Sequence, residues 1–508
     1  MIFREIGVVP DPQSPDVMIL KLSLHNVNVS ERALPWEFLL GDIVTIPEER
    51  IRDILAIVFQ KGWKQRVDIL SRQVFHFATD FVLSPISIEP EFVYYTTTVQ
   101  NATNVAPYLV LDKIVKELAP PNYKLDRMLF QFPGHFASVS SLIAKTLRSA
   151  IQAVMMIVAY NTYHPYTLGY NNTEKERWED ICYKYIDRRL PWIAGKFFLD
   201  KAYSEEKRRF VDTLTEELKS TYLQRVLNLD WISDVAKRLI QEKLFGLIVK
   251  IGYHKSTPNA TNATNLGDYY NDVNITDSLF NNALSIRHWD SDPLWNLLQR
   301  LVNKSVWPEI AGITQASIYY SEVPSYLSFS STGMIAAHEM THSLDTNGRL
   351  WNEKRQYRTW RDEKSIENFN NRKDCLINQY SDIRAVNHLG DPVFSTDGKP
   401  LFGNGSFTIS ENIADGGGLA TNWEARVQHE KKEPSQLLPG LEGFTKQQLF
   451  FINFAQNWCS METPSSTREN IQNGAHAPPF ARVLGALQNS KGFSDACKCN
   501  TALICELW

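Results

Sequence analysis

The sequence predicts a mainly α-helical protein with small β elements, an α+β fold, and three features carry that prediction. Apolar residues recur at helical spacing through much of the first 250 residues. A polar connection rich in Asn and Thr follows them. Beyond it, two histidines stand four residues apart, the spacing that places two side chains on one face of a helix. The chain of 508 residues is long enough for two or more domains with separate cores.

Two apolar stripes predict helices between residues 204 and 251. The first follows an acidic turn that begins at Ser204, and the second begins at Ile232. Both have the spacing of a core-facing helix surface and not that of a cofactor-binding motif. The stripes consist of Val211, Leu214, Leu218 and Tyr222, and of Ile232, Ala236, Leu239, Ile240, Leu244, Leu247 and Ile251.

The most apolar run, residues 150–160, predicts a buried helix, because it is too short to cross a hydrocarbon layer about 30 Å thick. At the N-terminus, Arg4 and Glu5 interrupt the apolar residues, so we expect neither a signal peptide nor a transmembrane segment in this chain.

A net charge of −4 gives no electrostatic reason to expect nucleic acid or an anionic membrane as partner. Small molecules or peptides are the expected ligands.

Residues 256–277 predict an exposed connection, since they are polar and hold three glycosylation sequons. This divides the chain into a mainly helical domain, residues 1–255, and a second domain, residues 278–508.

Six cysteines without a CxxC pair favour disulfides, and the sequons exceed the roughly four expected by chance. Both observations favour an extracellular protein or an ectodomain. The sequon asparagines are Asn28, Asn101, Asn171, Asn259, Asn262, Asn274, Asn303 and Asn404.

The sequence HEMTH, residues 338–342, predicts half of a catalytic zinc site. On a helix, His338 and His342 present two imidazole nitrogens to one metal ion, and Glu339 lies beside them. A zinc ion with three protein ligands lowers the pKa of a bound water toward about 7 and leaves the glutamate free to act as general base. Because a bare HExxH occurs by chance in about one in a hundred such chains, the prediction needs a third ligand.

The position of the third ligand separates the classes of zinc peptidase. A metzincin continues as HExxHxxGxxH, but Asp345 and Gly348 stand at the positions of its glycine and third histidine, which excludes that class. Thermolysin-like enzymes place a ligand glutamate about 20 residues after the second histidine. Asp362 and Glu363 lie there without the expected flanking pattern, and we expect them to be surface charges.

The sequence ENIAD, residues 411–415, supplies a stronger candidate. If Glu411 opens a helix, Asp415 lies one turn along on the same face. The first carboxylate can then ligate zinc, while the second accepts an N–H from a ligand histidine and fixes its tautomer. The glycines at 416–418 either allow close approach to the HEMTH helix or mark a helix end.

HEMTH followed by ENIAD is typical of the neprilysin and endothelin-converting-enzyme family of zinc metallopeptidases, which this chain resembles over most of residues 180–508. The resemblance implies a zincin-type catalytic domain and a helical domain that covers the active-site chamber. It also implies a zinc-dependent endopeptidase that hydrolyses oligopeptides on the amino side of hydrophobic residues, with Glu339 activating a zinc-bound water. One Zn²⁺ per chain is implied, held by His338, His342 and Glu411. Further matching stretches are AGITQ (311–315), LLPGLEGFTKQQLFFINFAQNWC (437–459), HAPPFARVLGALQNSKGF (476–493) and the terminal CELW.

The resemblance also assigns roles to residues around the zinc. Asp345 and Asp415 match carboxylates that orient the ligand histidines. His476 matches a histidine that stabilises the tetrahedral oxyanion, and Arg482 matches an arginine that binds substrate carbonyls. An apolar pocket for the residue after the scissile bond and one disulfide are implied as well. The pocket residues are Met334, Ile335, Trp458 and Val483, and the disulfide joins Cys375 to Cys505.

The chain departs from the family in two places. The substrate-binding edge strand is shorter here, in LVNKSVWPEIAGI (301–313), where Asn303 is the expected remnant of the substrate-binding asparagine and lies inside a sequon. The anchor and cysteines that open the family's sequences do not precede residue 1. Cys182, Cys459 and Cys499 match positions whose partners would lie in that region, so we expect them to be unpaired or paired differently, and Cys497 is an extra thiol.

These departures motivate an alternative function, a zinc-binding but catalytically impaired ectodomain that acts as a peptide-binding or interaction protein. The intact Glu339 favours the enzyme, because a chain that had abandoned hydrolysis would be free to lose its base. A structural zinc site with four protein ligands is a weaker alternative, since no cysteine or fourth histidine lies near the motifs.

Overall fold

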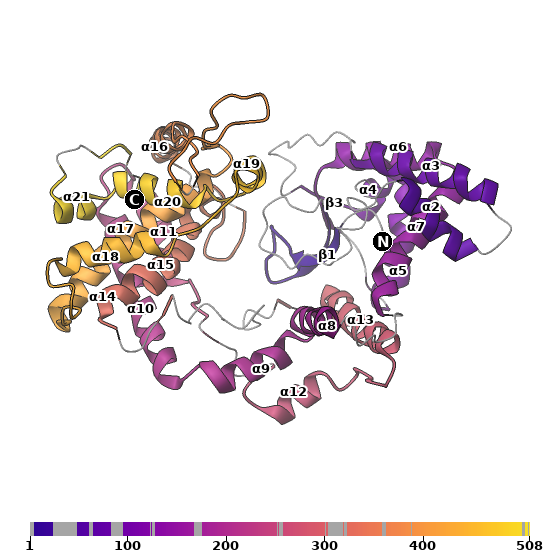
Figure 1. The fold of residues 1–508 in the computed structure, drawn as a ribbon, viewed down its shortest axis with the longest axis horizontal. Coiled ribbons are helices and arrows are strands. Elements are labelled where there is room, and N and C mark those ends of the chain that lie inside the picture. Colours follow the sequence, from indigo (N-terminus) through magenta and orange to yellow (C-terminus); the bar gives the residue numbers. More distant parts are fainter. Residues whose placement is uncertain are drawn as a thin grey trace. The chain divides into compact units, whose positions relative to one another are not determined.

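The computed structural model describes the chain in segments that form two compact units (Figure 1). One unit contains Met1–Pro191 and Thr264–Val306, and the other contains Trp192–Ala263 and Trp307–Trp508. We call them the N-terminal unit and the C-terminal unit. The described residues are 5–23, 48–59, 64–82, 95–121, 123, 127–166, 175–250, 252, 258–299, 301–302, 318–319, 323–357, 362–387, 389–499, 503–505 and 507–508.

The N-terminal unit contains a four-stranded sheet of order β1-β2-β4-β3. Strands β1 (Glu5–Pro10) and β2 (Met18–Ser23) are antiparallel, and β2 runs parallel to β4 (Met128–Phe130). Strand β3 (Thr96–Thr97) pairs antiparallel with β4. Leu20, Leu22, Met128 and Phe130 are buried in one cluster with residues of helices α4 (Val99–Val105), α5 (Leu111–Leu118) and α6 (Pro133–Lys145). The sheet therefore packs against helices, as in other α+β folds.

The helices of the N-terminal unit form a second apolar cluster. Its members come from α2, α3, α6 and α7. Within the described part of the chain, no single helix is long and apolar enough to cross a membrane; α6 and α7 pass the length and composition criteria only as a pair bent by 114°. The helices are α2 (Glu48–Phe59), α3 (Lys64–Val82), α4 (Val99–Val105), α5 (Leu111–Leu118), α6 (Pro133–Lys145), α7 (Arg148–Tyr163), α8 (Lys175–Arg189), α12 (Ala263–Tyr269) and α13 (Leu279–Asn296).

The C-terminal unit is helical and has one large apolar cluster, to which α10, α11, α15–α18 and α20 contribute. The C-terminal residues Leu507 and Trp508 are buried in the same cluster. Its helices are α9 (Pro191–Ala202), α10 (Glu205–Asn228), α11 (Asp234–Phe245), α14 (Ser325–Ser328), α15 (Met334–Thr341), α16 (Glu363–Ser381), α17 (Ile409–Lys432), α18 (Lys446–Gln456), α19 (Pro464–Asn473), α20 (Pro479–Gln488) and α21 (Lys491–Cys497).

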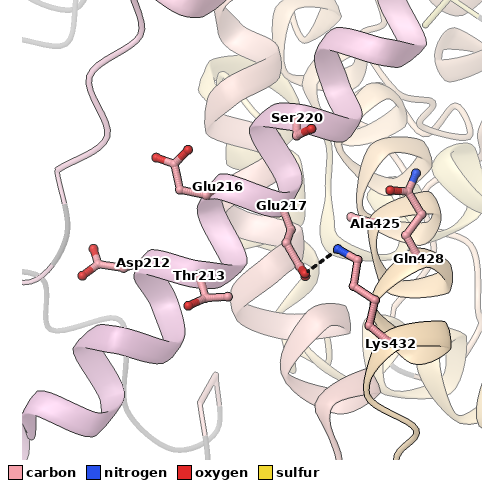
Figure 2. Close-up of a pocket in the computed structure, with 8 residues that line it drawn as sticks. All are labelled: Asp212, Thr213, Glu216, Glu217, Ser220, Ala425, Gln428 and Lys432. Atoms are coloured by element: carbon pink, nitrogen blue, oxygen red, sulfur yellow. Dashed lines mark hydrogen bonds and ion pairs between the residues drawn. The ribbon is translucent and has the colours of Figure 1, made fainter.

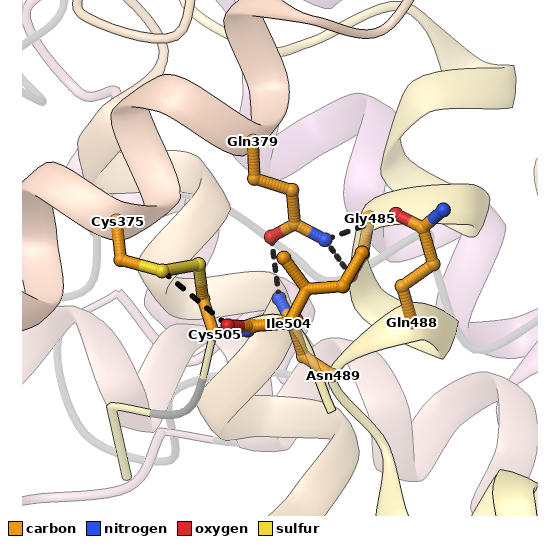
Figure 3. Close-up of a disulfide and its surroundings, with 7 residues drawn as sticks. All are labelled: Cys375, Gln379, Gly485, Gln488, Asn489, Ile504 and Cys505. Carbon is orange, nitrogen blue, oxygen red and sulfur yellow. Dashed lines mark hydrogen bonds between the residues drawn. A yellow bond between two sulfur atoms is a disulfide. The ribbon is translucent and has the colours of Figure 1, made fainter. Parts of the chain in front are cut away.

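The implied disulfide between Cys375 and Cys505 is present and ties the C-terminal tail to α16 (Figure 3). Beside it, the backbone N–H of Cys505 donates to Asn489 at 2.8 Å, and the Asn489 amide donates to Gln379 of α16 at 2.8 Å. The tail is therefore fixed by a covalent bond and by a polar network. The other four cysteines, Cys182, Cys459, Cys497 and Cys499, are free thiols.

The mainly helical fold class is confirmed; the first apolar stripe lies on α10, and the central part of the second lies on α11. All four residues of the first stripe are buried on α10, which Ser204 caps. The run at 150–160 lies in α7, where one face is buried, whereas Met155 and Met156 are 52% and 40% exposed. The second stripe was predicted too long: α11 ends at Phe245, Leu239 is 36% exposed, and Ile251 lies outside the described residues.

The two units differ from the predicted division into consecutive segments 1–255, 256–277 and 278–508. Helices α10 and α11, which that division puts in the first domain, pack in the cluster that contains α15 and α17. The apolar faces of α10 and α11 pack against residues beyond 307. The contacts therefore divide the chain between the two units at three places. One of these, between Ala263 and Thr264, falls within the predicted connection.

Candidate metal centre

Helix α15 carries the first four residues of HEMTH, and His342 begins the 3-10 turn that follows it (His342–Leu344). The residues before α15 contact α17. Phe329–Gly333 form a π-helical turn that leads directly into α15. Asn422 of α17 donates to the Phe329 carbonyl at 2.7 Å. A Cβ atom on Gly333 would lie 2.6 Å from the Asn422 side-chain oxygen, so any larger residue would displace that amide. Single π turns of this kind are frequent at functional sites.

Helix α17 carries ENIAD and crosses α15 at close range because of two glycines. A Cβ atom on Gly418 would lie 2.8 Å from the backbone nitrogen of His338, and one on Gly417 would lie 2.7 Å from both Thr341 and Trp508. A Cβ atom on Gly416, in contrast, would meet none of the described residues. The glycines therefore allow close approach of two helices, and the alternative interpretation as a helix end is wrong, because α17 continues to Lys432.

His338, His342 and Glu411 form a group whose potential ligand atoms lie within 4.8 Å of one another. The Nε2 atoms of the two histidines are 3.0 Å apart, and Glu411 Oε2 lies 3.1 Å from His338 Nε2 and 3.4 Å from His342 Nε2. Tetrahedral zinc with bonds of about 2.0–2.1 Å separates its ligand atoms by about 3.4 Å. The three residues therefore fit a zinc ion in both donor type and spacing.

The other ring nitrogens explain why this group suits a metal ion. His338 Nδ1 lies 2.9 Å from Asp415, and His342 Nδ1 lies 2.7 Å from Asp345. An Nδ1–H that donates to a carboxylate leaves the Nε2 of a neutral imidazole as a bare acceptor. Two such acceptors 3.0 Å apart cannot hydrogen-bond to each other, whereas both can bind one metal ion.

The electrostatics of the site favour positive charge between these residues. Burial would lower the pKa of His342, but hydrogen bonds with Asp345 and Glu411 raise it to about 10. Burial likewise opposes the charged form of Asp415, yet bonds from His338 and Arg482 hold its pKa below the usual value. The carboxylates thus stabilise a cation at the imidazole pair, which a divalent metal supplies.

Arg482 lies in α20 and forms a buried ion pair with Asp415. Its Nε and Nη2 atoms donate to the two carboxylate oxygens at 2.8 and 2.7 Å. The guanidinium also stacks 3.8 Å from the ring centroid of Trp458. Arg482 therefore extends the chain of contacts from His338 through Asp415 to an aromatic ring, a connection that no motif in the sequence indicates.

Two further residues with proposed roles lie at the exposed side of the site. His476 Nε2 is 3.0 Å from Glu411 Oε2, and its side chain is 52% exposed. Glu339 is exposed and lines a cavity of about 310 Å³. A carboxylate in an accessible cavity beside the metal ligands has the freedom to exchange protons with water and substrate.

This cavity beside Glu339 is mostly apolar and is walled by α10, α15 and the segment after α11. Of the four residues implied to form an apolar pocket, Ile335 alone is among its described lining residues. Met334 is 2% exposed in the core, Val483 packs against the same core, and Trp458 lies under Arg482. The described lining residues are Val211, Thr215, Lys219, Leu247, Ile248, Val249, Lys250, Gly252, Ile318, Thr332, Ile335, Ala336, Glu339 and Met340.

A second cavity, of about 500 Å³, lies between α10 and the C-terminal half of α17 (Figure 2). Glu217 points toward Lys432, 3.3 Å away, and also accepts from His429 at 2.9 Å. Asp212 and Glu216 point away from this pair in Figure 2. The described lining of this cavity contains none of the metal-site residues, and its ion pairs tie α10 to α17.

The remaining candidates from the sequence have simpler positions. Asp362 caps α16 by accepting from the Ser365 backbone at 3.1 Å, and Glu363 is exposed in the first turn. Asn303 lies outside the described residues. Ser410, which no sequence motif singled out, donates a hydrogen bond to Asp345. No periodic signal connects two positions 65 residues apart, so only their packing reveals this bond.

Comparison with protein families gives two matches that cover most of the chain. Models described as Peptidase family M13 match residues 1–254 and residues 303–503. Endothelin-converting enzyme 1 of Mus musculus is 31% identical over 94% of this chain and 61% of its own length. Neprilysin of Homo sapiens is 28% identical over 64% of this chain and 45% of its own length. The chain thus spans less than two thirds of the length of these relatives.

Solved structures show the same fold. PepO of Lactobacillus rhamnosis superposes with a TM-score of 0.73 at 16% identity, covering 99% of this chain and 80% of that one. The zinc metalloprotease ZMP1 of Mycobacterium tuberculosis, crystallised with an inhibitor, gives a TM-score of 0.71 at 16% identity, covering 98% and 78%. The architecture is therefore shared at low sequence identity.

Proposed function

Because the chain belongs to peptidase family M13, we propose that it is a zinc-dependent endopeptidase that hydrolyses oligopeptides on the amino side of hydrophobic residues. The observation that carries the proposal is the convergence of His338, His342 and Glu411 within 4.8 Å. When bound there, zinc acidifies a water and polarises the scissile carbonyl. The chain's own residues supply the remaining chemistry.

Glu339 is the proposed general base and acid. Its exposed carboxylate takes a proton from the attacking water and delivers it to the leaving amine, while the hydroxyl oxygen joins the carbonyl carbon. His476 lies at the open side of the ligand group, where its imidazole can donate to the developing oxyanion; removing such a donor costs about 3 kcal/mol of transition-state stabilisation. The Nη1 atom of Arg482 lies outside the ion pair with Asp415 and is the proposed donor to a substrate carbonyl.

The apolar cavity beside Glu339 supports a preference for hydrophobic substrate residues. Ile335 and Glu339 stand one helical turn apart and both line it, so a side chain held by Ile335 lies near the proposed base. A volume of about 310 Å³ is enough for a large aliphatic or aromatic side chain. We propose that this cavity receives the residue after the scissile bond.

An extracellular location, or that of an ectodomain, belongs to the same proposal. The Cys375–Cys505 disulfide is of the kind that persists in oxidising compartments. Among the described sequon asparagines, Asn101, Asn262, Asn274 and Asn404 are exposed, as glycosylation requires.

The test is hydrolysis of a short quenched peptide with one Phe or Leu after the intended scissile bond. We expect cleavage before that residue by the zinc-loaded protein, and loss of at least about 100-fold in kcat for Glu339→Gln, because the general base contributes on that scale. A chelator abolishes the activity, and Glu363→Gln, at an exposed glutamate outside the site, retains it. A folded protein substrate tests the restriction to oligopeptides.

Two outcomes decide between the functions. Cleavage by Glu339→Gln at the wild-type rate would contradict the assigned base. A folded protein that binds one zinc per chain without turnover would favour the alternative, a zinc-binding ectodomain that captures peptides. Binding of the uncleaved peptide to that protein would then be measured by its fluorescence anisotropy.

A further inference from the structure

The carboxylate of Asp345 accepts four hydrogen bonds, and one of them comes from the helix that carries the third metal ligand. His342 Nδ1 lies 2.7 Å from Oδ2, and the backbone nitrogens of Asn347 and Gly348 donate to Oδ1 at 2.8 and 2.6 Å. The hydroxyl of Ser410 donates to Oδ2 as the fourth bond. A carboxylate has about four acceptor positions, so this buried group is fully paired.

The first turn of α17 needs such an anchor. Thr408 is the N-cap residue, but its side chain makes no capping bond to the backbone of this helix. Instead its hydroxyl donates to the Asn404 carbonyl and accepts from the Asn412 amide. Helix ends without a capping bond fray readily, since the first four N–H groups have no partner within the helix. Glu411 stands in this turn.

Ser410 and Glu411 are adjacent in the chain and reach His342 from two sides. Glu411 approaches the Nε2 atom of His342, where the metal binds, and Ser410 reaches Nδ1 through Asp345. The contacts form a ring that runs from His342 to Asp345, to Ser410, to Glu411 and back through the metal position. The bond between Ser410 and Asp345 on one side of the ring therefore also restrains the position of Glu411 relative to His342 on the other side.

We propose that Ser410 is a positioning residue for the metal ligands, whose hydroxyl sets the place of Glu411 relative to His342. The inference rests on the proposed zinc site. Partners of ligand histidines typically change metal affinity by about 10- to 100-fold when removed. Ser410 acts one bond further out, so we expect its hydroxyl to contribute less than such a partner does, about 3- to 10-fold.

The experiment measures zinc release from the full-length zinc-loaded protein to an excess of a coloured chelator, without reference to activity. We expect Ser410→Ala to release zinc about 3- to 10-fold faster than the wild type. Ser410→Thr keeps the hydroxyl at a half-buried position and restores slow release. Thr421→Val is the matched control, because Thr421 lies in the same helix and its buried hydroxyl has no hydrogen-bond partner among the described residues.

Each outcome bears on a separate statement. Unchanged or slower zinc release from Ser410→Ala would overturn the positioning role. The role would also be overturned if Ser410→Thr and Thr421→Val released zinc as fast as Ser410→Ala. A wild-type protein that binds no zinc would contradict the proposed function instead. If Ser410→Ala failed to fold, zinc release from Ser410→Gly and Ser410→Cys, which also lack the hydroxyl, would take its place.

Discussion

Lys243 shows at the residue scale how burial and charge compete near the metal site. It lies in α11 and donates to the carbonyls of Gly348 and Trp351, the latter at 2.7 Å, so it holds the segment that follows the HEMTH helix. Burial lowers the pKa of its ammonium from 10.5 to about 8, although Asp345 acts in the opposite direction. Folding therefore favours the neutral amine.

This shift predicts how stability depends on pH. Between about pH 8 and pH 10.5 the unfolded chain holds the proton on Lys243 and the folded chain does not, so the free energy of unfolding rises with pH. Below the folded pKa the buried charge costs about 3 kcal/mol, and above the unfolded pKa this cost has disappeared. We expect the stability difference between wild type and Lys243→Met to grow in favour of the wild type as pH rises through this window.

Thermal unfolding of both proteins across the window measures the difference. Lys237→Met, a change at a half-buried lysine of the same helix, controls for the loss of one charge. A difference that is constant with pH would show that Lys243 keeps its proton when the protein folds.

At the scale of elements, the contact between α15 and α17 determines the metal site. His338 lies on α15, His342 in the 3-10 turn that continues it, and Glu411 on α17, and the backbones of α15 and α17 meet at Gly418. Since side chains at this crossing would separate the helices, the spacing of the ligand atoms depends on the absence of a Cβ atom. The same helix offers an internal comparison, because a Cβ atom on Gly416 would have no described neighbour within 4 Å.

Gly418→Ala and Gly416→Ala therefore have opposite expected effects. The first forces its Cβ atom against the His338 backbone and costs about 1–3 kcal/mol of stability, with weaker zinc binding. The second gains up to about 1 kcal/mol, because alanine is the better helix former and meets no obstacle. Thermal unfolding and zinc titration of the two variants measure both effects. Equal destabilisation by both would indicate that helix geometry and not close approach matters.

The sequence predicted these elements well where local pattern determines them. The i, i+4 spacing of His338 and His342 and the stripe on α10 are properties of single helices, so they are visible in the sequence. Contacts between helices are not periodic. The ion pair of Arg482 with Asp415 and the bond of Ser410 to Asp345 join positions 67 and 65 residues apart, and neither followed from spacing.

At the scale of the whole molecule, each unit is built from two separate chain segments. This explains why the predicted division at 256–277 differs from the units: composition identifies an exposed connection, but not which helices pack together. Helix α10 has the same apolar stripe whether its partner precedes or follows it. Only the contacts place it with α15 and α17.

The Cys375–Cys505 disulfide closes a loop across most of the C-terminal segment, with a sequence separation of 130. Closing a loop of this length restricts the unfolded chain and stabilises the fold by about 4–5 kcal/mol in the chain-entropy model. We therefore expect Cys375→Ser together with Cys505→Ser to unfold at a clearly lower temperature. Cys497→Ser, at an exposed free thiol, is the control and should leave the melting temperature unchanged. Equal melting temperatures for all three proteins would contradict the prediction.

The order of the helices of the C-terminal unit along the chain also has a consequence for biosynthesis. Helix α10 ends at Asn228 and leaves the ribosome long before Ile409 opens α17, and α20 and the tail follow later still. The ribosome adds about 5–20 residues per second. For roughly 10 seconds or longer, the apolar side chains of the α10 stripe therefore lack these partners; they are Val211, Leu214, Leu218 and Tyr222. Until then the stripe is accessible to chaperones that bind exposed apolar side chains, so α10 depends on their protection for longer than a helix whose partners are adjacent in the sequence.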